Sequence, residues 1–143
     1  MLLKFYYHKT NSQGGDIFPQ VRISSVENLP IKIGDQSTHE RIELVVDYVL
    51  VLKKQNNDTA FFERLIDAMV YELYLPEAIK TASCDVLKSL KDLPALKGDW
   101  SDEKKLHTIE KVYEELSNPK HPVSVAMFKM DTIEEIRIIE GKQ

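Results

Sequence analysis

The sequence of 143 residues lacks several features that would define a class of protein. It has one cysteine, Cys84, so no internal disulfide can form, and such usage suits a reducing cytoplasm, where we expect the protein. Its longest strictly apolar runs are three or four residues, whereas a membrane-spanning helix needs about 20. The segment from Met1 to His8 lacks the apolar core and the small-residue cleavage site of a signal peptide. These absences favour a globular cytoplasmic domain.

A basic excess is also missing. The net charge is −4, whereas DNA-binding domains usually carry an excess of lysine and arginine, because phosphate neutralisation supplies most of their non-specific affinity. The charges are unevenly distributed: residues 1–36 carry +1, and residues 37–143 carry −5. Any contact with nucleic acid is therefore expected in the N-terminal third, and the remainder is expected to act as scaffold or as protein-facing surface.

Recognisable catalytic and metal-binding patterns are lacking as well. The four histidines have no ligand spacing, and we expect them to be solvated or to cap helices (His8, His39, His107 and His121). No nucleophile elbow is present, and Cys84 fits a small half-buried residue on a helix better than a nucleophile. Glu140-Gly-Lys142 matches part of a metal-dependent nuclease motif but has no Pro-Asp partner, so we attribute it to chance. We predict no catalytic, cofactor-binding or metal-binding residue in this chain.

What the sequence does contain is helical periodicity. The clearest helix runs from Thr59 to Tyr74, where apolar residues recur in pairs every four positions and form a wide stripe that faces a core. Four residues of this stripe are predicted to be core: Leu65, Ile66, Met69 and Val70.

Other helices are predicted on both sides of that stripe. They run from Leu2 to Lys9, from Ser37 or Thr38 to Lys54, from Ala78 to Leu90 after Pro76, from Ser101 to Leu116, and from the capping box at Thr132 to Ile139. Val123 to Met130 is expected to be extended or irregular, and Gln20 to Ile23 is expected to form a strand. The predicted fold is mainly α (α+β), a bundle of five to six helices with a small N-terminal β element.

Two segments resemble a known family. Phe18-Pro-Gln-Val-Arg-Ile23 with Leu29-Pro-Ile31 resembles the end of the target-recognition (specificity) region of bacterial adenine-specific DNA methyltransferases and of single-chain type II restriction–modification enzymes. Ile66-Asp-Ala-Met-Val-Tyr-Glu-Leu-Tyr74 is similar to a helix that follows the specificity segment in these enzymes. The tail from Glu134 to Lys142 extends the similarity, whereas Thr81 to Val123 resembles nothing specific.

The resemblance implies a part of an enzyme that has no catalytic activity of its own. Adenine methyl transfer needs a glycine-rich turn for S-adenosylmethionine and an Asn/Asp-Pro-Pro-Tyr/Phe loop for the flipped base. Both are absent, and Asn118-Pro-Lys-His121 is only a partial imitation of the loop. We therefore expect a C-terminal fragment of a larger enzyme, whose upstream catalytic domain binds S-adenosylmethionine. Residues 1–36 would end the specificity domain, and residues 37–143 would form a helical buttress packed with it as one unit.

Four basic residues of the N-terminal third are the candidate DNA-binding residues: Lys4, Lys9, Arg22 and Lys32. Arg22 would face away from the apolar side of its strand, toward duplex DNA or the rest of the enzyme, and its alternative role is a solvated side chain or an ion pair with Glu27. The implied partners are double-stranded DNA and the upstream catalytic domain. The alternative interpretation of the whole chain is a helical protein–protein interaction module with no role on DNA, which the acidic part of the chain would suit.

Overall fold

The structure, a computed structural model, describes residues 1–11 and 27–142. Within these ranges the chain forms seven α-helices, one short 3₁₀-helix and no β-strand. They are α1 (Leu2–Asn11), α3 (Gln36–Lys54), α4 (Ala60–Tyr74), α5 (Pro76–Ala82), η1 (Leu87–Ser89), α6 (Asp102–Leu116), α7 (Pro122–Met130) and α8 (Glu134–Ile139). The predicted mainly α fold is confirmed, with seven described helices in place of five to six. The predicted strand from Gln20 to Ile23 lies outside the described residues.

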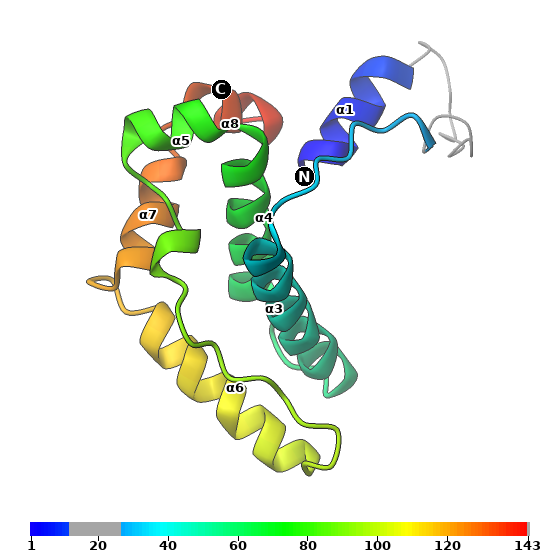
Figure 1. The fold of residues 1–143 in the computed structure, drawn as a ribbon, viewed down its shortest axis with the longest axis vertical. Coiled ribbons are helices and arrows are strands. Elements are labelled where there is room, and N and C mark those ends of the chain that lie inside the picture. The colour runs from blue at the N-terminus through cyan, green and yellow to red at the C-terminus, as the bar shows by residue number, and fades with distance from the viewer. Residues whose placement is uncertain (12–26, 143) are drawn as a thin grey trace.

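Helix α4 is the centre of the arrangement. It packs against α1, α3, α5 and α7, and α6 closes the bundle by contacting α3 and α7. Figure 1 shows α3 crossing α4, while α6 and α7 follow one another along the other side of the fold. Helix α1 lies beside α4 at the edge of the bundle, and the segment before α3 runs back along α1. None of the helices in the described ranges has the length and apolar character needed to cross a membrane.

The long helices begin where the sequence provides a cap. The Asp35 carboxylate accepts a hydrogen bond from the Thr38 backbone N–H at 2.7 Å, and the Ser101 hydroxyl accepts one from Lys104 N–H at 3.3 Å. Such caps satisfy N–H groups that the first turn of a helix leaves without partners. Lys53 occupies the last turn of α3, where a positive charge complements the helix dipole.

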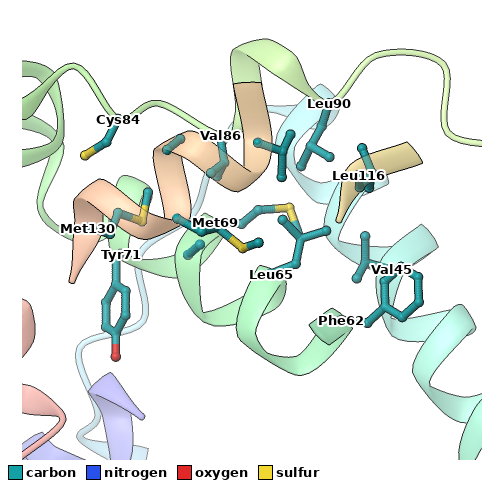
Figure 2. Packing of buried hydrophobic residues seen from close by; sticks show 14 of the residues in the cluster. Val45, Phe62, Leu65, Met69, Tyr71, Cys84, Val86, Leu90, Leu116 and Met130 are labelled. Carbon is teal, nitrogen blue, oxygen red and sulfur yellow. The ribbon is translucent and has the colours of Figure 1, made fainter. Parts of the chain in front are cut away.

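One continuous core runs through the bundle. Leu65 and Met69 of α4 are completely buried, as predicted, whereas Ile66 and Val70 are only partly buried. Figure 2 shows Leu65 and Met69 in the middle of the buried side chains, with Val45 at one end of the cluster. The central position of α4 therefore follows from its apolar stripe.

The prediction of one helix from Ala78 to Leu90 is wrong. Helix α5 ends at Ala82, because Ser83 adopts the left-handed conformation with φ 51° and ψ 52°. The chain then turns, and the Glu72 carboxylate accepts hydrogen bonds from the backbone N–H groups of Val86 and Leu87 at 2.8 and 3.0 Å. A side chain of α4 thus provides the partner that a continued helix would have given these groups.

The expectation of an irregular segment from Val123 to Met130 is also wrong, because these residues form most of α7. Pro122 occupies the first turn, where its fixed φ suits a helix. The Nδ1 atom of His121 accepts a hydrogen bond from Val123 N–H at 3.2 Å and caps the helix. Four residues of the segment are buried at helical spacing: Val123, Ala126, Met127 and Met130.

The last helix forms where it was predicted, but its expected cap does not. Helix α8 begins at Glu134, and Ile133 precedes it without a side-chain cap. The Thr132 hydroxyl instead donates a hydrogen bond to the carbonyl oxygen of Lys129 at 2.7 Å, which secures the turn after α7.

Candidate functional site

The polar edge of α4 contacts the C-terminal end of the described chain. The Tyr71 hydroxyl donates to a carboxylate oxygen of Glu140 at 3.3 Å. Figure 2 shows the Tyr71 hydroxyl pointing away from the buried cluster. Tyr71 belongs to the second segment of the predicted family resemblance and attaches it to the region after α8.

Tyr74 makes the most specific of these attachments. Its hydroxyl donates a hydrogen bond to the Pro30 carbonyl oxygen at 2.7 Å and accepts one from the Lys32 backbone N–H at 2.8 Å. Both hydrogen-bonding functions of one phenol are therefore used on the backbone on either side of Ile31. Leu29-Pro-Ile31, which ends the first segment of the predicted resemblance, is therefore hydrogen-bonded to Tyr74, the last residue of the second.

A groove lies beside this attachment and has a volume of about 650 Å³. Its lining combines three lysines with two carboxylates, and we call it the lysine groove. The lining residues are Lys32, Glu72, Leu73, Pro76, Lys80, Ser83, Asp85, Leu87 and Lys88. Lys32 precedes α3, Lys80 lies on α5 and Lys88 lies on η1, so the fold brings together lysines that are distant in the sequence.

The Glu72 carboxylate already accepts hydrogen bonds from the protein's own backbone. Burial raises the pKa of its carboxyl above the usual value, and the backbone N–H groups of Leu87 and Val86 oppose that rise by hydrogen bonding to the charged form. Asp85 adds a second negative charge beside it and raises the pKa further, whereas Arg41 lowers it. The side chains that line the lysine groove sum to +1, although residues 37–143 as a whole carry −5.

The four predicted DNA-binding residues are not gathered in one place. Lys32 lines the lysine groove. Lys4 and Lys9 lie on α1 and are exposed, and the Lys9 ammonium sits 5.7 Å from the centre of the Phe5 ring. Arg22 lies outside the described residues. Lys80 and Lys88, which sequence reasoning assigned to the buttress, are the lysines that the fold places with Lys32.

A second groove, with a volume of about 640 Å³, is mainly apolar. It lies between the end of α3, the start of α4 and α6, and we call it the apolar groove. Phe61 and Tyr113 meet edge to face across it, with ring centres 5.3 Å apart. The polar residues of its lining are Asn57, Asp58 and Glu110.

The side chains considered as a nucleophile or as metal ligands lie in environments that do not favour these roles. Cys84 is buried, burial raises the pKa of its thiol, and the thiol points to the Ile79 carbonyl at 3.6 Å. Since the thiolate is the reactive form, this environment disfavours a nucleophile. Cys84 lies after the end of α5 and is fully buried, not half-buried on a helix. Among the described residues, no three acidic, histidine or cysteine side chains are grouped as a metal site.

Comparisons of the chain with protein-family models, with curated proteins and with solved structures found no match.

Proposed function

We propose that this chain is a non-catalytic C-terminal part of an adenine-specific DNA methyltransferase or type II restriction–modification enzyme, where it supports recognition of the DNA target. It would act in the cytoplasm, against double-stranded DNA and against the upstream catalytic domain of the same polypeptide. Chemistry on the base, and the binding of S-adenosylmethionine, would belong to that upstream domain.

The hydrogen bonds of Tyr74 are the observation that carries this proposal. The two segments that resemble the family end at Ile31 and at Tyr74, and the Tyr74 hydroxyl bonds the backbone at Pro30 and Lys32. The described end of the first segment is thus hydrogen-bonded to the last residue of the second. This arrangement supports the idea that the helical part buttresses the end of a specificity region.

Binding to duplex DNA tests the proposal. Phosphate contacts from Lys4, Lys9, Arg22 and Lys32 would contribute about −3 to −4 to the slope of log affinity against log salt. The acidic remainder repels the duplex within a Debye length of about 8 Å. We therefore expect weak binding without sequence preference, with a dissociation constant no tighter than about 10⁻⁵ M.

The measurement is a fluorescence anisotropy titration of a labelled duplex at several salt concentrations. Changing Arg22 and Lys32 together to alanine should flatten the slope by about 2, while changing Lys104 and Lys105 to alanine should leave it unchanged. Equal effects from the two pairs would argue against a DNA-facing N-terminal third. The reading frame offers a further check, since an Asn/Asp-Pro-Pro-Tyr/Phe motif encoded upstream would support the proposed parent enzyme.

The apolar groove favours a second candidate function, a helical protein–protein interaction module. Its volume of about 640 Å³ lies within the usual range of about 300–1,000 Å³ for binding pockets, and exposed aromatic side chains are common at interfaces. Tyr113, 46% exposed, supplies such a side chain. Failure of the chain to bind duplex DNA at any salt concentration would put this second function ahead of the first.

A further inference from the structure

The lysine groove gathers three cations from separate parts of the chain on one surface. Two lysines elsewhere are each paired with a carboxylate: Lys53 lies 2.7 Å from Glu63, and Lys142 lies 2.6 Å from Glu140. Lys32, Lys80 and Lys88 line one groove, and within the described part of the chain none of the three forms a salt bridge. The positive charge of the groove is therefore available to a ligand.

The nearby carboxylates do not cancel this charge. Glu72 directs one carboxylate oxygen at the backbone N–H groups of Val86 and Leu87, which shapes the turn after α5. Asp85 is the one other acidic residue in the lining, against three lysines. Cations that line one groove repel one another, and a bound anion lowers that repulsion.

The position of Lys32 in the groove depends on the Tyr74 attachment. The Tyr74 hydroxyl bonds the Lys32 backbone N–H, while Ile31 and Ile33, on either side of Lys32, remain 65% and 81% exposed. This hydrogen bond thus anchors the backbone where Lys32 lines the groove. Burial of the two isoleucines would instead favour turning the segment so that they face the protein. With its backbone anchored, Lys32 has only its side chain left to order when a ligand binds.

We infer that the lysine groove binds a phosphate group through Lys32, Lys80 and Lys88. The source of the phosphate, a phosphodiester of the duplex DNA backbone, rests on the proposed function. The inference extends the DNA-facing surface from the N-terminal third onto α5 and η1, in the part of the chain that the overall charge marks as acidic. Lysine contacts of this kind position a protein on the duplex and do not specify bases.

A paired substitution tests the groove on the full chain. Lys80→Gln with Lys88→Gln removes two exposed charges, and we expect the salt slope for a labelled duplex to flatten by about 1.8, because each contact contributes about 0.9. The matched control is Lys97→Gln with Lys111→Gln, which removes two exposed lysines outside the groove lining and should leave the slope unchanged. Circular dichroism verifies that both variants retain the helical fold.

Glu72→Gln provides a variant with the opposite expectation. It keeps an acceptor oxygen for the N–H groups of Val86 and Leu87 but removes a negative charge, so the groove lining changes from +1 to +2. Duplex binding should tighten and the slope should steepen. Weaker binding by Glu72→Gln would overturn the inference.

A second ligand, inorganic phosphate, distinguishes the groove from the source of its ligand. Backbone amide resonances of Lys80, Ser83 and Lys88 should shift when phosphate is added to the wild-type chain, and much less in the Lys80→Gln, Lys88→Gln variant. Suppose that the duplex binds with the same slope to the wild type, the groove variant and the control variant. Phosphate binding by the lysine groove is then refuted, and the proposed function stands. If phosphate shifts these resonances and no duplex binds, the groove stands and the DNA role fails. If neither the duplex nor inorganic phosphate binds, both the inference about the groove and the proposed function are refuted.

Discussion

Tyr74 and Pro30, 44 residues apart in the sequence, are joined by a hydrogen bond in which the phenol donates to the carbonyl oxygen at 2.7 Å. The same phenol oxygen accepts the Lys32 backbone N–H at 2.8 Å, so one side chain at the end of α4 holds the chain just before α3. This relationship connects the helical bundle with the segment that leads out of the proposed specificity region. It also determines where Lys32 lies relative to α5 and η1.

The first prediction concerns Tyr74→Phe, which removes both hydrogen bonds and keeps the ring. The free energy of unfolding should fall by about 1–3 kcal/mol, because each of the two hydrogen bonds usually contributes about 0.5–1.5 kcal/mol. The backbone N–H of Lys32 should also lose its protection against hydrogen exchange, because its partner is the phenol oxygen. Denaturant unfolding and amide exchange followed by NMR measure the two effects.

Tyr113→Phe is the control for this variant. Its ring is 46% exposed and contacts Phe61, and the substitution keeps that ring contact. It should leave the exchange of the Lys32 amide unchanged. Equal protection of Lys32 in the wild type and in Tyr74→Phe would contradict the role of the phenol.

The second prediction concerns the core. Met69→Ala should destabilise the protein by about 2–5 kcal/mol, because Met69 is completely buried and its truncation leaves a cavity. Ile66→Ala should cost less, since Ile66 is only partly buried. Leu50→Ala serves as the exposed control: its side chain is 60% exposed and should change stability by less than about 0.5 kcal/mol. Chemical denaturation showing a similar loss for Met69 and Leu50 would contradict the central position of α4.

Local patterns were sufficient to predict α4 and α6. The predicted helix from Thr59 to Tyr74 and the observed Ala60–Tyr74 differ by one residue, because the apolar stripe lies within the helix itself. Ser101, where the second of these helices was predicted to start, is the N-cap of α6. In both cases the signal and the structure it produces lie within a few residues of each other.

Contacts between distant residues explain the errors. Helix α5 stops short because Ser83 turns the chain and Glu72, on α4, accepts the N–H groups that a longer helix would use. Helix α7 was missed although its buried residues have helical spacing, because valine favours extended structure and the segment has nine residues. Tertiary packing overrides such weak propensities.

The lysine groove could not be predicted for a related reason. Lys80 and Lys88 belong to residues 37–143, whose net charge of −5 suggests an acidic surface. Charge summed along the sequence does not show which side chains share a surface. Lys80, on α5, and Lys88, on η1 after the turn at Ser83, line the same groove as Lys32 only in the folded chain. The sequence predicts Lys32 as a DNA-binding residue from its position in the N-terminal third. It does not predict that Lys80 and Lys88 line the same groove.

The third prediction concerns the cofactor. The chain alone should neither bind S-adenosylmethionine nor methylate DNA, because it lacks both the glycine-rich turn and the Asn/Asp-Pro-Pro-Tyr/Phe loop. Isothermal titration calorimetry with S-adenosylmethionine should show no binding heat, with an intact methyltransferase as positive control. Micromolar binding by this chain would refute its assignment as the non-catalytic part of such an enzyme.

The last prediction uses the raised pKa of Glu72. Burial raises that pKa above the ordinary value of 4.5, so between 4.5 and the folded-state pKa the native protein binds more protons than the unfolded chain. The contribution of Glu72 to stability is therefore fully present below the unfolded-state pKa and is lost as the pH rises through the folded-state pKa. Glu72→Gln keeps a side-chain oxygen that accepts from the backbone N–H groups of Val86 and Leu87, and it cannot titrate, which removes this contribution.

The difference in unfolding free energy between wild type and Glu72→Gln should consequently shift in favour of the wild type as the pH falls from about 7 toward about 4.5. Urea denaturation of both proteins across this range measures the difference, in which the titration of other carboxylates largely cancels. A shift in favour of Glu72→Gln would mean that the N–H groups of Val86 and Leu87 stabilise the charged carboxylate more than burial destabilises it. In that case the charge of Glu72 would be a stabilising part of the turn after α5.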